Sequence, residues 1–69
     1  MPLSMARVGD ENSVKRVGGK PETRQFLENL GFVPGSLVTL ITQISGNVIV
    51  SIRDSRVAIS REMASKIQV

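Results

Sequence analysis

The side chains that most often carry enzyme chemistry are scarce in this sequence of 69 residues. There is no His and no Cys, so the commonest general base is missing and no thiolate nucleophile or zinc cluster can form. The only adjacent carboxylates are Asp10 and Glu11. Neighbouring side chains in an extended segment point to opposite faces, so we interpret this pair as turn-forming. We predict no catalytic residue, no bound metal and no cofactor.

One segment, Gly18-Gly19-Lys20, invites comparison with a phosphate-binding loop. The upstream glycine of such a loop is missing, and Pro21 stands where Ser or Thr would bind magnesium. We interpret the segment as the turn before a helix, because Pro suits the first helical position. A catalytic amine at Lys15 or Lys20 would require burial to lower its pKa, and both lie among polar residues.

The net charge of +3 favours acidic partners only weakly. With no Trp and no Tyr, the chain cannot line the aromatic groove that binds proline-rich peptides. The two Phe residues also offer little surface for stacking RNA bases. Binding of an RNA backbone through scattered cations stays open, and it would depend strongly on salt; those cations are Arg16, Lys20, Arg24 and Arg56.

The length predicts a single domain, residues 1–69. The start of the sequence lacks the basic region and long apolar stretch of a signal peptide. The apolar runs are shorter than the ~20 residues that a membrane-spanning helix needs. We expect a cytoplasmic protein that does not insert into a membrane.

Segment 23–35 carries the clearest local pattern. Phe26, Leu27 and Leu30 occur at helical spacing, which predicts a helix from about residue 22 to residue 30 with these three side chains in the core. Gly31 can end the helix in the left-handed conformation, and Phe32 can then pack back on Leu27.

Directly after the helix, Pro34-Gly35 suits the central positions of a type II turn, because Pro fixes φ and Gly accepts a positive φ. Ser60 can cap a short second helix. Ser45-Gly46-Asn47 is typical of a hairpin loop, and we expect another tight connection at Asp54-Ser55. Strands are expected at residues 3–8, 13–17, 37–44, 48–52, 56–59 and 67–69, with Asp10 to Asn12 as a turn.

Alternation within the longer strands predicts which side chains share a face. One face should carry Val38, Leu40 and Ile44, and a second should carry Val48, Val50 and Ile52. The expected fold is mainly β: a small barrel of about five strands with one inserted helix and a short C-terminal helix. Closure into a barrel would protect the strand edges.

Over nearly the whole chain, glycines, apolar residues and turns follow one another in a recognisable order. The pattern comprises Gly9, Gly18-Gly19, Arg24, Phe26-Leu27, Leu30-Gly31-Phe32, Pro34-Gly35, Val38 to Ile41, Ile59-Ser60, Ala64, Ile67 and Val69. In these features the chain resembles the FeoA family, ferrous iron transport protein A. Two loops depart from the family pattern: Asp54-Ser55-Arg56 lacks a frequent glycine, and Ser45-Gly46-Asn47 lacks a proline.

The resemblance implies an SH3-like barrel with helical insertions and no enzymatic activity. It implies a cytoplasmic protein that assists FeoB, a membrane-embedded ferrous iron transporter fused to a G protein. The same fold occurs in iron-dependent repressors, whose DNA-binding helical domain this chain lacks. The alternative function is a small basic barrel that binds RNA.

We hypothesise that the protein is an adaptor that docks on the transporter through the region between the helix and the Pro34-Gly35 turn. Arg24 and Phe32 are the expected anchors, since Arg and aromatic side chains dominate many interfaces. Packing of Phe32 at the helix end is the other interpretation of that residue. Arg56 and Arg61, which flank the last long strand, are further candidates.

Three residues of this region are expected to be structural, because backbone geometry alone explains them; they are Gly31, Pro34 and Gly35. The last segment, Ile67-Gln68-Val69, is expected to be an edge strand. Two copies could pair by strand addition through it or through another exposed edge.

Overall fold

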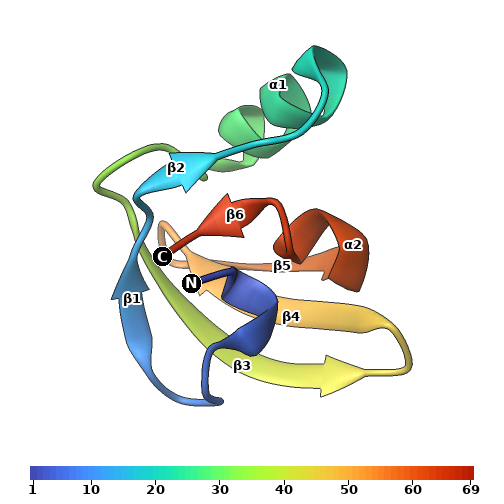
Figure 1. The fold of residues 1–69 in the computed structure, drawn as a ribbon. Helices are drawn as coiled ribbons and strands as arrows, with labels where there is room; N and C mark the ends of the chain where they lie inside the picture. Colours follow the sequence, from blue (N-terminus) through green and yellow to red (C-terminus); the bar gives the residue numbers. More distant parts are fainter.

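A computed structural model describes residues 1–69 as six strands, two α-helices and one 3-10 turn (Figure 1). In chain order these are η1 (Leu3–Met5), β1 (Glu11–Ser13), β2 (Arg16–Val17), α1 (Pro21–Leu30), β3 (Leu37–Ile44), β4 (Asn47–Ile52), β5 (Ser55–Ser60), α2 (Arg61–Ala64) and β6 (Ile67–Gln68). The mainly β fold and the two helices predicted from the sequence are confirmed.

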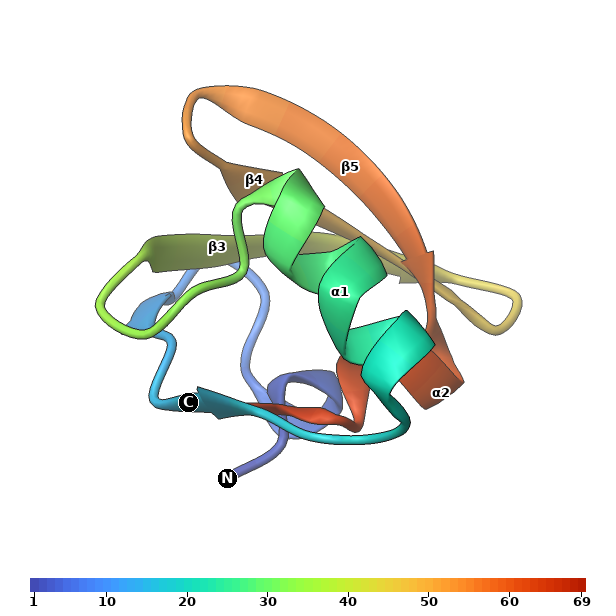
Figure 2. The ribbon, with the colours of Figure 1, turned by 90° about the horizontal axis from the view of Figure 1, so that it is seen from above.

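The strands form two antiparallel sheets around one core. The larger sheet has the order β1-β3-β4-β5, and the smaller one pairs β2 with β6. Helix α1 lies across the opening between β5 and the small sheet (Figure 2). Fifteen buried residues form the core, and all of them are apolar. No helix is long and apolar enough to cross a membrane.

The inner face of the large sheet was largely predictable. Val38, Leu40 and the alternating Val48, Val50 and Ile52 of β4 are all buried. Ile44 is not: it is 57% exposed, which corrects the expected face of β3. Register shifts between Leu40 and Thr42, so the extra residue of a bulge moves every later side chain to the opposite face.

The N-terminal segment is not the expected strand 3–8. It forms the 3-10 turn η1, in which the Met5 and Ala6 amides donate to the Pro2 and Leu3 carbonyls. Leu3 and Ala6 are both buried. Their spacing of three residues suits a turn of 3-10 helix, whereas a strand would place them on opposite faces.

The expected strand 13–17 divides into β1 and β2. Residues 11 and 12, expected in a turn, belong to β1 and pair with β3. The Val14 amide donates to Ser36, and the Lys15 amide donates to Gln68. The backbone therefore changes partner at Val14-Lys15, from the large sheet to the small one, and one continuous strand is impossible.

The last strand, β6, is present but is not a free edge. It pairs with β2 on one side, and Gln68 forms a bridge with Pro2 on the other. The Val69 amide also donates to the Met1 carbonyl. Because both sides of this strand are occupied within the chain, Ile67-Gln68-Val69 is not the free edge that pairing of two copies through it would require.

The two ends of α1 form as predicted. Pro21 is the first helical residue, and Gly31 is left-handed with φ of 112°. The Gly31 amide donates to Glu28, and the Phe32 amide donates to Leu27, which together make a Schellman motif. The predicted turn at Pro34-Gly35 is also confirmed, because Gly35 has φ of 91° and the Ser36 amide donates to Val33.

The β4–β5 connection lies one residue earlier than expected. Its two residues are Arg53 and Asp54, with φ of 51° and 62°, and Ser55 already belongs to β5. Two consecutive positive φ values are typical of the turn that joins two-residue hairpins. Without glycine in either position, this turn stores some backbone strain.

Ser60 is expected to be a stabilising cap of α2, as the sequence predicts. Its Oγ accepts a hydrogen bond of 3.1 Å from the Met63 amide. Ser60→Ala should lower the free energy of unfolding by about 1 kcal/mol, because the amide loses its partner. Urea denaturation followed by circular dichroism checks this, with Ser13→Ala as the control, because Ser13 is exposed and its side chain makes no hydrogen bond. Equal stability of Ser60→Ala and the parent would contradict it.

Candidate docking surface

Phe32 is not available to a partner. Its side chain is 0% exposed and belongs to the core cluster. The Schellman motif places it beyond the end of α1, next to the buried Leu27. The hypothesis of Phe32 as an exposed anchor is therefore corrected: the residue packs at the helix end, which was the other interpretation of the sequence.

Phe26, in contrast to Phe32, is exposed. It was expected in the core, but it is 49% exposed. On α1 the buried stripe is centred on Leu27, with Thr23 and Leu30 half-buried beside it. Phe26 is about 100° away from Leu27 around the helix axis, so it lies at the border of that stripe. Helical spacing predicts which side of the helix faces the core, but it does not predict how completely each side chain on that side is buried.

Arg24 is exposed on α1, as expected. It precedes Phe26 by two residues, and such residues are about 160° apart around the helix. Side chains at this spacing do not face each other. Arg24 and Phe26 therefore lie on opposite sides of the buried stripe and cannot act as one pair of anchors.

Arg56 and Arg61 are both exposed but far apart. Arg56 is near the beginning of β5, whereas Arg61 begins α2 after the end of β5. Five residues of strand separate them by about 17 Å. The four partner-binding residues predicted from the sequence therefore do not come together in one surface.

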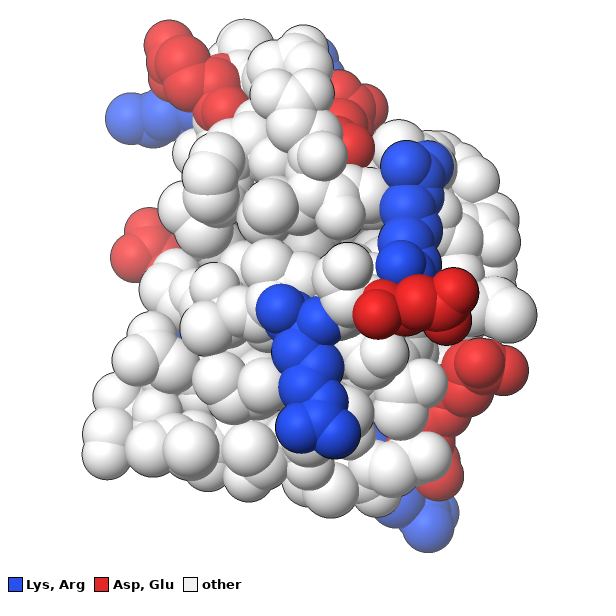
Figure 3. All heavy atoms as spheres, turned by 180° about the vertical axis from the view of Figure 1, so that it is seen from behind, with Lys and Arg blue, Asp and Glu red and all other residues white.

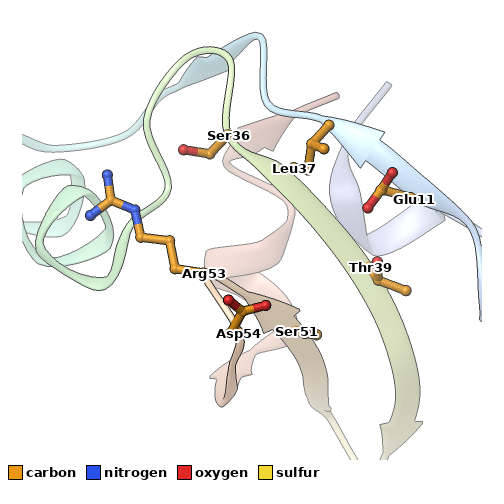
Figure 4. A pocket seen from close by; sticks show the side chains of 7 residues that line it. All are labelled: Glu11, Ser36, Leu37, Thr39, Ser51, Arg53 and Asp54. Atoms are coloured by element: carbon orange, nitrogen blue, oxygen red, sulfur yellow. The ribbon is translucent and has the colours of Figure 1, made fainter.

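Arg53, which the sequence did not single out, contacts the end of α1. A Cβ added to Gly31 would be 3.0 Å from the Arg53 Cδ, and the Arg53 side chain points toward α1 in Figure 4. The last turn of α1 contains no basic residue of its own. A cation from the β4–β5 turn is favourable there, because the C-terminal end of a helix carries partial negative charge.

Two apolar side chains stay accessible on one side of α1. Phe26 is exposed, and Leu30 is half-buried and packs against the core; residues four positions apart are neighbours on a helix surface. We call Phe26 and Leu30 the α1 rim. It combines a large exposed aromatic with a rigid apolar base, which is the composition of an interface anchor.

A separate polar hollow of about 310 Å³ lies on the large sheet between β1, the beginning of β3 and the β4–β5 turn (Figure 4). It is lined by Glu11, Ser36, Leu37, Thr39, Ser51, Arg53 and Asp54. No group of three or more His, Cys, Asp or Glu side chains is placed to hold a metal ion.

A family model with the description "FeoA domain" matches residues 1–69 of this chain. The chain belongs to the FeoA family. This confirms the resemblance inferred from the order of its glycines and apolar residues. Over 68 residues the chain is 37% identical to a Methanocaldococcus jannaschii protein named "Putative Fe(2+) transport protein A", covering 99% of this chain and 83% of that protein.

Solved FeoA structures have the same fold. An iron uptake regulatory protein (FeoA) is 29% identical with a TM-score of 0.88, covering 97% of this chain and 91% of that chain. Chlorobium tepidum FeoA is 26% identical with a TM-score of 0.91, covering 99% and 67%. Stenotrophomonas maltophilia FeoA, solved with zinc and described as an SH3 domain protein, is 23% identical with a TM-score of 0.88, covering 100% and 88%. The SH3-like class of this FeoA domain is thereby confirmed.

Proposed function

We propose that this FeoA protein is a cytoplasmic accessory protein that binds the cytoplasmic part of a FeoB-type ferrous iron transporter and supports its activity. Membership of the FeoA family and the likeness to an Fe(2+) transport protein A support a role in ferrous iron transport. The absence of His and Cys from the sequence favours an adaptor over an enzyme, because the usual nucleophiles and bases are missing.

The observation that carries this proposal is the exposure of Phe26. A phenyl ring that is 49% exposed loses apolar contact with water when a partner covers it. Its neighbour in the α1 rim, Leu30, packs against the core, so docking there would order little of the chain. Preorganisation of this kind reduces the entropy lost on binding.

Phe26→Ala is expected to weaken binding to the purified cytoplasmic part of a FeoB-type transporter by about tenfold or more, as for a typical aromatic anchor. Calorimetry or a binding assay with the full chain measures this. The effect should persist at high salt, because the lost contact is apolar. Unchanged affinity of Phe26→Ala would contradict docking through the α1 rim.

Met5→Ala is the matched control. Met5 is another large apolar side chain, 70% exposed, but it belongs to η1 and not to the α1 rim. Its truncation should leave transporter affinity within about twofold of the parent.

RNA provides the second arm of the same experiment, since the chain carries a net charge of +3. Transporter binding that survives salt supports the adaptor function. Binding of RNA alone, lost as salt rises, would support the basic barrel instead.

A further inference from the structure

A row of four polar side chains crosses the outer face of the large sheet. The register places Glu11 beside Thr39, Thr39 beside Ser51, and Ser51 beside Arg56. The residues that alternate with them, such as Val50, point into the core, so these four point outward. The row therefore carries a carboxylate at its β1 end and a guanidinium at its β5 end.

The two charged ends of this row have no hydrogen-bond partner within the chain. Side chains make few hydrogen bonds in this structure, and none involves an Arg, Lys, Asp or Glu side chain. Three strand spacings separate Glu11 from Arg56, which is about 14 Å. They cannot pair with each other, so both charges are free to meet groups outside the chain.

The polar hollow adjoins the acidic end of the row. Carboxylates of Glu11 and Asp54 and hydroxyls of Ser36, Thr39 and Ser51 line it. Figure 4 shows Arg53 directed toward α1 and away from Glu11. A guanidinium has five donors and no acceptor, and it binds carboxylates with charge-assisted hydrogen bonds. This hollow therefore suits an arginine side chain that arrives from outside.

Apolar side chains surround the row on the same face. Leu37 is 55% exposed, and Ile49 pairs with the exposed Ala58 two register positions from Ser51 and Arg56. Figure 3, which views the molecule from behind, shows two basic side chains and an acidic one in the middle of this side, with uncharged surface around them. Covering these apolar side chains would remove apolar area from water.

We propose that this outer face is an interface between two copies of the chain, related by a two-fold axis parallel to the strands. Such an axis places Glu11 of each copy opposite Arg56 of the other, and Thr39 opposite Ser51. The row is thus complementary to itself, as a two-fold interface requires. Arg56 of the second copy approaches the acidic side of the hollow, and Leu37, Ile49 and Ala58 are covered.

The order of charges along the row favours a second copy of the chain as the partner of this face. A two-fold axis in the same plane but perpendicular to the strands would bring Glu11 against Glu11 and Arg56 against Arg56. Only the axis parallel to the strands replaces these two repulsive contacts with attractive contacts between Glu11 and Arg56. Four short strands present a face on the order of 300 Å², below the roughly 800 Å² per partner of a standard stable interface, so the dimer forms at high protein concentration.

Charge exchange tests this dimer. Sedimentation equilibrium of the parent from about 10 µM to about 1 mM should show a monomer–dimer equilibrium that added salt weakens. Arg56→Glu and Glu11→Arg should each raise the dissociation constant at least about tenfold, because like charges then face each other. An equimolar mixture of the two variants should dimerise again, since each supplies the charge that the other needs.

Arg16→Glu is the matched control. It makes the same change of charge on an exposed residue of the small sheet, and it should dimerise like the parent. A parent that stays monomeric at about 1 mM, an Arg56→Glu variant that dimerises normally, or a mixture that does not recover would each overturn the proposal. Loss of transporter binding by Arg56→Glu with a monomeric parent would assign the face to the transporter instead.

Discussion

Phe32→Ala should lower the free energy of unfolding by about 3–5 kcal/mol, the range for truncating a fully buried Phe. The side chain is 0% exposed and is the largest of the fully buried ones. Domains have about 0.05–0.15 kcal/mol of stability per residue, which gives about 3.5–10 kcal/mol for a chain of 69 residues. The variant should therefore lose from about a third to all of its free energy of unfolding.

Urea denaturation followed by far-ultraviolet circular dichroism measures this, because the chain has no Trp or Tyr to report by fluorescence. Phe32→Leu should remain folded, since it leaves a smaller cavity. Phe26→Ala is the matched control: the same truncation at an exposed helix position should cost less than about 1 kcal/mol. Similar losses at Phe26 and Phe32 would show that their burial has been assigned wrongly.

Gly31→Ala is expected to lower the free energy of unfolding by about 2 kcal/mol, through two separate effects. Gly31 has φ of 112°, and its added Cβ would be 3.0 Å from Arg53 Cδ and 3.2 Å from Arg53 Nε. A left-handed conformation costs a residue with a Cβ about 1–2 kcal/mol. The crowded Arg53 side chain must also move away from the end of α1.

Gly35→Ala separates the two effects. Gly35 has φ of 91°, but nothing lies within 4 Å of its added Cβ, so only the backbone cost of about 1 kcal/mol should appear. In a background of Arg53→Ala, the cost of Gly31→Ala should fall toward that of Gly35→Ala. A double-mutant cycle by urea denaturation gives the coupling energy. No coupling would mean that Arg53 moves aside without loss.

Local chemistry explains why much of the fold could be predicted. The helix begins at Pro21 and ends at Gly31, and the turn follows at Pro34-Gly35, because each residue satisfies a backbone requirement of its own position. Alternation in β4 likewise indicates its buried face. These features depend on neighbours in sequence, so the sequence alone indicates them.

Features that depend on distant partners could not be predicted. The bulge after Leu40 arises from the match between β3 and β4, and no residue type marks it. The 3-10 turn at the N-terminus forms because Leu3 must enter the core. The aromatic docking residue was predicted wrongly for the same reason. Phe26 lies within α1 and Phe32 just beyond its end, and only the packed structure distinguishes buried Phe32 from exposed Phe26.

Arg53 illustrates a further limit. Its two-residue turn and its contact with Gly31 join segments that are more than twenty positions apart in the sequence. The signal that could have indicated it is an absence: α1 has no cation in its last turn, so another segment can supply one. The row from Glu11 to Arg56 was equally hidden, because strand register alone brings its members into line.

The meeting of the two chain ends bears on when the protein can fold. The Met1 ammonium donates to the Val69 carbonyl at 3.1 Å, and the Val69 amide donates back to Met1. Leu3, near one end, and Ile67, near the other, are both buried in the same core. During synthesis the contacts between the first and last residues can therefore form only after residue 69 has left the ribosome. Contacts so distant in sequence slow folding, and until they form, the apolar strands stay exposed to aggregation.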